Sequence, residues 1–277
     1  LTSVYSTASR DYVVMFIQTT AAQILPQQRA PFASGPTPVS DNQLLASLPL
    51  EERQRLTPYL ETVFLKFRQV LIEFDSPIEY VYFLDDAVTS TVVLTPEGET
   101  IEVGISGAEG FVGLSLLAGI ERSNATVLTQ IPGRALRMRA DDFVKHVTRF
   151  GGTTRELLLR YSNFFQVMVQ QHAACNVAHA VEQRMCRWIL LTHDRVRSNV
   201  FPLTHEYLAV MLGVRRATVT TIARRLKEQG VIAYTRGRLA VTDRSWLENC
   251  SCECYGLIKE QMARTFDDNG PRADGKY

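Results

Sequence analysis

The hydrophobic period of this chain changes near residue 140, and this change restricts its possible folds more than any other feature. Between residues 63 and 139, apolar residues form short or alternating runs separated by turn sequences such as Asp75-Ser76-Pro77 and Pro132-Gly133. From 153 to 179 there is no proline, and apolar residues recur at helical spacing. A β-rich segment followed by helices predicts an α+β fold.

The β-rich segment predicts seven strands. Because they are short and closely spaced, they favour a β-sandwich or a jelly-roll β-barrel over 63–139. Thr95–Glu99 lies between two of the runs and predicts a hairpin. The predicted strands are Val63–Phe67, Val70–Phe74, Tyr80–Leu84, Val88–Leu94, Thr100–Ile105, Ala125–Ile131 and Ala135–Arg139.

A long helix is predicted from Thr153 to about His179. Its apolar residues recur at spacings of three and four, which is a heptad pattern. Such a seam packs either against a second copy of the helix or against the chain's own barrel, and we favour a parallel dimer. The seam residues are Leu158, Tyr161, Phe165, Met168, His172 and Cys175. For His172 we expect a buried, hydrogen-bonded side chain rather than a metal ligand.

The segment from Leu203 to Thr242 has the pattern of a winged helix-turn-helix. Thr204 is a suitable N-cap for a first helix, and Gly213 ends it where positive φ is needed. A second helix from about Arg216 to Gln229 has apolar residues on one face and small or basic residues on the other. Two β-rich runs then flank Thr235–Arg238, which predicts a two-stranded wing.

The charge distribution points to DNA. The whole chain has a net charge of +1, but residues 200–249 contain eight basic and four acidic residues, a local charge of +4. Small residues let a helix approach base edges, and arginine binds guanine or phosphate. We predict Arg216 as a guanine contact. The full set of predicted DNA-binding residues is Arg215, Arg216, Ala217, Thr218, Thr220, Thr221, Arg224, Arg225, Arg236 and Arg238.

Composition excludes several other classes. Apolar runs such as Phe111–Ile120 are shorter than the roughly 20 residues of a membrane helix, and we expect a cytoplasmic protein without membrane contact. All five cysteines follow residue 174, and an odd number without a secretory signal predicts reduced thiols. The sequence contains no nucleophile–base pair, phosphate loop or paired carboxylates, so we do not expect an enzyme.

The order of barrel, long helix and winged helix resembles the Crp/Fnr family of bacterial transcription regulators, over about residues 40–258. The matching stretches are Leu203–Ala209, Leu212–Arg216, Thr218–Thr220, Tyr234–Arg238 and Cys252–Tyr255. The resemblance implies a cyclic-nucleotide-binding-like effector domain, a dimer on a palindromic operator and, for an activator, contact with RNA polymerase. It is strongest to a subgroup without a recognisable cyclic-AMP signature.

The patterns and the resemblance together divide the chain into five segments. Residues 1–39 are predicted to be a flexible tail, 40–150 the barrel effector domain and 151–180 the dimerisation helix. Residues 181–258 are the winged helix-turn-helix domain, and 259–277 are predicted to be a C-terminal tail.

The barrel departs from the cyclic-AMP-binding members of the family. They carry Gly-Glu-x-x-Leu followed by Arg-Ser/Thr-Ala, whereas this chain has Leu114 after Gly113. Leucine cannot accept a hydrogen bond from the ribose, so we expect no cyclic AMP. Glu109 lies nearby and is a candidate substitute acceptor for the ribose hydroxyl, but its spacing differs from that of the family's glutamate. The candidate effector-pocket residues are Gly113, Leu114, Arg122, Ser123 and Asn124, and Asn124 shifts the register between Arg122 and the following alanine.

Metal sites are not predicted. The oxygen sensors of the family bind an iron–sulfur cluster through N-terminal cysteines, which this chain lacks before Cys175, so no such cluster is expected. Cys250, Cys252 and Cys254 alternate, which is compatible with metal ligands or redox thiols as well as with a packing role. No second ligand pair is evident, and packing is favoured. No cofactor is identified.

The sequence therefore predicts a homodimeric transcription regulator that binds double-stranded DNA. An effector in the barrel would shift the long helix and a hinge near Ala178–Ala180. The rival hypothesis is a ligand-binding regulator whose winged helix docks a protein; its interaction with DNA would be weak and insensitive to salt. A third is a DNA-binding protein with a vestigial barrel, which would bind its operator with or without an effector.

Overall fold

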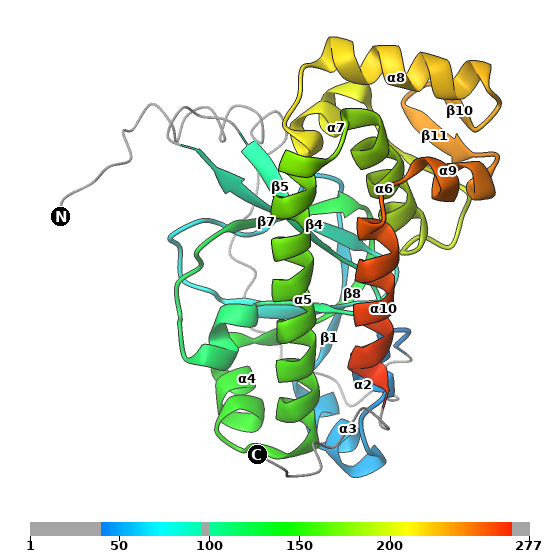
Figure 1. The fold of residues 1–277 in the computed structure, drawn as a ribbon. Coiled ribbons are helices and arrows are strands. Elements are labelled where there is room, and N and C mark those ends of the chain that lie inside the picture. The colour runs from blue at the N-terminus through cyan, green and yellow to red at the C-terminus, as the bar shows by residue number, and fades with distance from the viewer. Residues whose placement is uncertain (1–39, 96–99, 268–277) are drawn as a thin grey trace, which may run out of the picture.

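Two antiparallel four-stranded sheets pack together in the first half of the computed structural model, which describes residues 40–95 and 100–267 (Figure 1). The strand orders are β1-β8-β3-β6 and β2-β7-β4-β5. The chain crosses between the sheets repeatedly, which is the jelly-roll arrangement predicted from the sequence. The strands are β1 (Glu61–Leu65), β2 (Val70–Ile72), β3 (Tyr80–Leu84), β4 (Val88–Leu94), β5 (Thr100–Ser106), β6 (Phe111–Val112), β7 (Thr126–Ile131) and β8 (Gly133–Arg139).

Strands β4 and β5 pair as far as Leu94 opposite Thr100, as predicted, whereas residues 96–99 of the predicted hairpin turn lie outside the described residues. Strand β6 was not predicted because it has only two residues, Phe111 and Val112. Short helical segments lie before, between and after the strands. They are α2 (Gln43–Ala46), α3 (Leu50–Leu56), η2 (Thr57–Tyr59), η3 (Leu114–Ala118), α4 (Ala140–Phe143) and η4 (Val144–Thr148).

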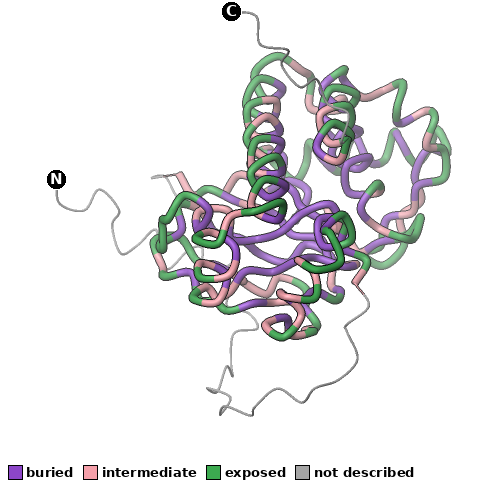
Figure 2. The backbone as a smooth tube through the Cα atoms, turned by 90° about the horizontal axis from the view of Figure 1, so that it is seen from below, coloured by how far each residue is buried: buried purple, intermediate pink, exposed green. Residues whose placement is uncertain are grey.

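Helix α5 (Gly152–Ala178) runs along the barrel, and two glycines set how closely it approaches. A Cβ on Gly104 of β5 would lie 2.5 Å from the Phe165 ring, and a Cβ on Gly110 would overlap the Tyr161 hydroxyl. That hydroxyl is 2.7 Å from Ser106 Oγ. Figure 2 shows buried and exposed residues alternating along this helix, as expected for a helix with one face on the barrel.

This packing corrects the prediction for the heptad seam. Five of its six side chains are buried within one chain, and the partly buried Phe165 packs against Gly104. His172 Nδ1 lies 3.1 Å from the carbonyl oxygen of Val103 on β5. The seam is therefore buried within its own chain, against the barrel and, at Cys175, against Cys252 just before the C-terminal helix. The seam residues are Leu158, Tyr161, Phe165, Met168, His172 and Cys175.

The chain then breaks at His179 and Ala180, whose backbones are extended, and a set of smaller elements follows. Strand β9 joins the wing as a third strand that was not predicted, because a polar segment precedes it. The elements are α6 (Val181–His193), β9 (Val200–Pro202), α7 (His205–Leu212), α8 (Arg216–Glu228), β10 (Ile232–Thr235), β11 (Arg238–Val241), α9 (Arg244–Cys250) and α10 (Cys254–Phe266).

Helix α10 corrects the predicted C-terminal tail, because it continues to Phe266 and lies beside α5 (Figure 1). Tyr255, Ile258 and Met262 follow one another at spacings of three and four, which gives α10 one apolar face that packs on the hydrophobic core. The predicted flexible segment 1–39 and residues 268–277 lie outside the described residues. Among the described residues, no helix is both long and apolar enough to cross a bilayer.

Candidate nucleic-acid interface

The helix-turn-helix is built by one cap, one glycine and one apolar face. Thr204 Oγ1 accepts the N–H of Tyr207 at 3.1 Å and begins α7. Gly213, at φ 62°, ends it in the left-handed conformation. Helix α8 then packs inward through four buried side chains, which leaves its other face to solvent. The buried side chains are Val219, Ile222, Ala223 and Leu226.

All ten residues predicted to bind DNA are exposed, and they lie on α8, at its start or on the wing. Helix α8 stands at the edge of the molecule, on the side away from the barrel (Figure 1). The structure therefore brings together on one module the residues Arg215, Arg216, Ala217, Thr218, Thr220, Thr221, Arg224, Arg225, Arg236 and Arg238.

The wing presents its arginines through a two-residue turn. Arg236 and Gly237 both have positive φ, 48° and 75°, and they join β10 to β11. This is the turn geometry that suits the twist of a tight hairpin. Arg236 and Arg238 therefore lie near the tip as exposed cations.

Two of the exposed arginines have acidic neighbours. Arg216 Nε lies 3.6 Å from a carboxylate oxygen of Glu206, and Arg225 contacts Glu182. Exposed pairs of this kind contribute only about 0–1 kcal/mol, so a phosphate can replace the carboxylate. Within the described residues, Arg224, Arg236 and Arg238 form no ion pair.

His205 belongs to this surface and was not predicted. Its Nδ1 lies 3.1 Å from Thr220 Oγ1 on α8, and its ring meets the Tyr234 ring edge-on at 4.7 Å. Burial, together with nearby Arg216, lowers the pKa of His205. The residue thus links the first helix, the second helix and the wing. Its position directly after the N-cap was the only sequence signal.

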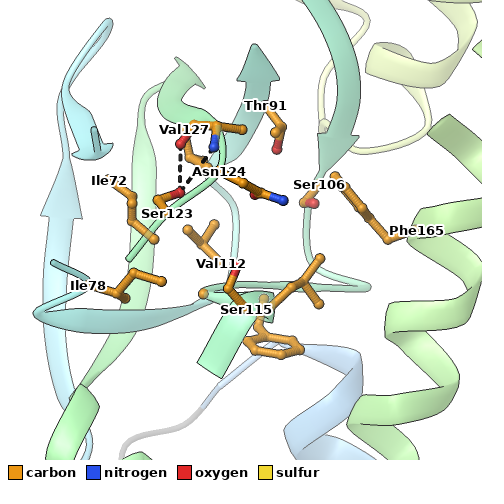
Figure 3. Close-up of a pocket in the computed structure, with 14 residues that line it drawn as sticks. Ile72, Ile78, Thr91, Ser106, Val112, Ser115, Ser123, Asn124, Val127 and Phe165 are labelled. Carbon is orange, nitrogen blue, oxygen red and sulfur yellow. Dashed lines mark hydrogen bonds between the residues drawn. The ribbon is translucent and has the colours of Figure 1, made fainter. Parts of the chain in front are cut away.

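The barrel contains a small uncharged cavity of about 70 Å³ beside α5 (Figure 3). Of the predicted effector-pocket residues, Gly113, Leu114, Ser123 and Asn124 line it. None of its 14 described lining residues is charged. A site for a drug-sized ligand usually has a volume of about 300–1,000 Å³, so this cavity is small.

Arg122 does not line the cavity, which corrects its predicted place in the pocket. Its Nε lies 3.0 Å from Asp75 Oδ1, and the side chain is exposed. A backbone bridge between Pro77 and Arg122 holds this segment at the surface, next to Asp75. The barrel therefore does not direct this arginine towards a bound phosphate.

The comparisons with known proteins agree with this architecture. Residues 183–250 match the family model described as a Crp-like helix-turn-helix domain. They form a Crp-like helix-turn-helix domain. No curated protein sequence matches the chain.

Solved structures show that the barrel, α5 and the Crp-like domain together have the fold of Crp/Fnr regulators. FixK2 from Bradyrhizobium japonicum is similar with a TM-score of 0.60 and 14% identity, over 70% of this chain and 98% of that one. A CRP-family transcriptional regulator from Thermus thermophilus has a TM-score of 0.57 and 18% identity, over 68% and 96%. The c-di-GMP-responsive regulator CLP of Xanthomonas campestris has a TM-score of 0.54 and 12% identity, over 70% of this chain and 99% of that one.

Buried polar contacts join the Crp-like domain to the barrel. Trp188 Nε1 on α6 donates to Glu102 Oε1 on β5 at 2.7 Å. Arg195 Nε donates to Glu109 Oε1, also at 2.7 Å, and both side chains are at most 4% exposed. Glu109 is therefore held by the Crp-like domain and is not available as a substitute ribose acceptor. Tyr207 Oη completes the joint, 3.2 Å from Ser90 Oγ on β4.

Four side chains of the types that bind metals meet between the end of α5 and the start of α10. They are Cys175, His179, Cys252 and Cys254, and their ligand atoms all lie within 4.8 Å of one another. No second ligand pair for the C-terminal cysteines was evident from the sequence. The structure supplies one in Cys175 and His179, at the end of α5. Cys250 takes no part, because it lies beside Cys186. A hydrogen bond from Cys252 lowers the pKa of Cys175 to about 5.

Proposed function

We propose that this protein is a sequence-specific DNA-binding transcription regulator. The observation that supports this most directly is the division of α8 into two faces. Its apolar face is buried in the Crp-like domain, and its small and basic face is exposed together with the wing arginines. Such a face approaches base edges in the major groove, while flanking arginines bind phosphates.

The proposed active form is a homodimer on a palindromic operator. Because the heptad seam faces the barrel, the second copy packs on the outward face of α5. Leu159 and Val177 are exposed there, and their separation of 18 residues places them on the same face of the helix. The two copies of α8 would then read half-sites about one helical turn of DNA apart.

The barrel serves in this proposal as an effector domain that does not take a cyclic nucleotide. A cyclic phosphate requires a cation, and the described lining of the cavity contains none. Arg122 is engaged by Asp75 at the surface. The uncharged lining suits a small neutral or apolar molecule. The signal would pass from the cavity to α5 through Phe165, which lines the cavity and belongs to the helix.

An effector acts by favouring one of two arrangements of the domains. The break at His179 and Ala180 lies between α5 and the Crp-like domain, so a shift of α5 changes the position of α8. The buried contacts between the domains would have to rearrange in that transition. RNA polymerase is the further partner expected if the protein activates transcription.

The test is selection of genomic DNA fragments by the purified protein, without added ligand, at two salt concentrations. We expect enrichment of a palindrome. Affinity should fall steeply with salt, by roughly 10³-fold or more between about 50 and 200 mM if six or more phosphates are contacted. The Arg216→Ala variant should lose preference for one base pair in each half-site.

Arg264→Ala is the matched control, because Arg264 is an exposed arginine on α10 whose partner is Glu260. It should leave the selected sequence and the affinity unchanged. A weak, salt-insensitive interaction, or an identical footprint after Arg216→Ala, would contradict the proposal. The former result would favour a winged helix that docks a protein.

A further inference from the structure

Three segments that are far apart in sequence bring sulfur and nitrogen atoms to one point. Cys175 lies in the last turn of α5 and His179 directly after it, while Cys252 and Cys254 lie before and at the start of α10. Cys175 Sγ is 3.4 Å from Cys252 Sγ, and Cys254 Sγ is 3.6 Å from His179 Nδ1. The cluster thus combines Cys175 and His179 from the end of α5 with Cys252 and Cys254 from the start of α10.

These separations are those of ligands around a single metal ion. With zinc–sulfur bonds of about 2.3 Å, the corners of a tetrahedron are about 3.8 Å apart. All four ligand atoms lie within 4.8 Å of one another, so small side-chain adjustments suffice. A cluster of several iron atoms distributes its thiolates over different metals and needs wider spacing.

We propose that Cys175, His179, Cys252 and Cys254 form a structural zinc site. Three thiolates and one imidazole are a common donor set of closed, tetrahedral zinc sites. Three of the four residues are buried, and His179 is half-buried, so the site has little room for an additional ligand. It is therefore a structural and not a catalytic site.

The surroundings orient the ligands as outer-shell groups do in metal sites. His179 presents Nδ1 to the cluster, and its other nitrogen, Nε2, lies 3.1 Å from Glu253 Oε1. A carboxylate on the far side of the imidazole fixes the ring and strengthens it as a ligand. Gln171 Nε2 donates to Cys254 Sγ at 3.0 Å, which stabilises a thiolate.

A buried arginine balances the negative charge that the proposed zinc site would carry. Zinc bound by three thiolates and a neutral histidine carries a net charge of −1. The Arg187 side chain is buried, and its charge acts on the Cys175 thiol. Its Nε and Nη1 have no hydrogen-bond partner among the residues that the structure describes. A buried guanidinium with donors that form no hydrogen bond is costly, and an anionic metal site beside it offsets part of that cost.

The position of the site defines what the metal does. It fixes the start of α10 to the end of α5, next to the break that leads into the Crp-like domain. Zinc would therefore restrict rotation at this hinge and hold α10 along α5. The existence of the site does not depend on DNA binding, so its test and the test of the proposed function can fail independently.

The experiment measures metal bound to the full chain, purified with a thiol reductant and supplied with zinc alone. We expect about one zinc per chain by elemental analysis. Replacement by cobalt should give the visible bands of a tetrahedral site and thiolate charge-transfer absorption. Cys252→Ser should lose the metal, whereas the matched control Cys250→Ser should retain it, because Cys250 lies outside the cluster.

Two further variants keep the test informative if Cys252→Ser does not fold. His179→Cys should retain the metal and increase the cobalt charge-transfer intensity, because a fourth thiolate replaces the imidazole. Glu253→Gln should weaken zinc binding by roughly 10- to 100-fold. Its control, Glu260→Gln further along in α10, should not.

Three results would overturn the proposal. The first is a reduced, folded chain that binds neither zinc nor cobalt stoichiometrically. The second is equal loss of metal in Cys250→Ser and Cys252→Ser. The third is a disulfide between Cys175 and Cys252 that persists in the purified chain after treatment with the thiol reductant and excludes zinc.

Discussion

Trp188 donates its indole N–H to the carboxylate of Glu102 across 2.7 Å, and both side chains are buried between the barrel and the Crp-like domain. The hydroxyl of Ser90 and the charges of Arg187 and Arg195 also face this carboxylate. Tyr207 lies against the same site. A titratable group at a domain joint makes the joint sensitive to pH.

Stability should depend on pH through Glu102. Burial raises the pKa of Glu102 from 4.5 to about 7. Between these values the folded chain keeps a proton that the unfolded chain releases, so the free energy of unfolding falls as pH rises from about 4.5 to about 7. The contribution is at most about 1.4 kcal/mol per pH unit. Urea unfolding at several pH values measures it.

Glu102→Gln keeps an acceptor for Trp188 and should remove this slope. The control is Glu121→Gln, because Glu121 is exposed. Burial lowers the pKa of His172, so this residue makes the free energy of unfolding rise with pH in the unaltered chain and in both variants alike. The quantity to compare is therefore the difference in slope between the variants. Equal slopes in Glu102→Gln and the unaltered chain would contradict the prediction.

The buried pair of Glu109 and Arg195 should be costly to break. Arg195→Met leaves a buried carboxylate without its partner, which typically costs about 3–5 kcal/mol of unfolding free energy. The neighbouring Arg197→Met is the control, because Arg197 pairs with Asp41 at 2.8 Å while 64% exposed. It should cost about 0–1 kcal/mol. Chemical denaturation measures the unfolding free energy of both variants. Similar losses in the two would show that burial of the ion pair does not determine the cost of breaking it.

Gly104→Ala should destabilise the contact between α5 and the barrel. The added Cβ would meet the Phe165 ring at 2.5 Å, so the ring or the helix must shift, at a cost of about 1–3 kcal/mol. Gly256→Ala on α10 has open space around the new Cβ and should instead stabilise by about 0.4–1 kcal/mol. Thermal unfolding should therefore move in opposite directions in the two variants.

The wing arginines should affect affinity without affecting sequence preference. Arg236→Ala removes an exposed cation at the wing tip, and we expect a weaker affinity for all DNA sequences. The slope of log affinity against log salt should fall in magnitude by about one. Titrations at several salt concentrations, with specific and unrelated duplexes, measure this. A change of selected sequence would mean that Arg236 reads bases.

Local patterns predicted much of the fold. Thr204, Gly213 and the apolar spacing of α8 act within a few residues, and each was placed correctly. The β4–β5 pairing followed from alternating residues on either side of a turn. The heptad in α5 was ambiguous for a physical reason: burial against a barrel and burial against another helix require the same apolar spacing.

Contacts between distant segments could not be predicted from one sequence. Glu102 and Glu109 have no local feature that distinguishes buried joint residues from surface carboxylates. Cys175 and Cys252 are 77 residues apart, and their encounter depends on how α10 packs along α5. Arg122 was placed in the pocket by resemblance, whereas the extra residue Asn124 and the nearby Asp75 leave it at the surface.

The course of α10 beside α5 has a consequence for the order of folding. During synthesis the barrel, α5 and the helix-turn-helix all leave the ribosome before α10 does, and domains tend to fold as they emerge. The two domains can therefore each be complete while the helix that fastens one to the other is still missing. Their docking becomes final only after α10 has been made, so the contact at the hinge forms later than the two domains that it joins.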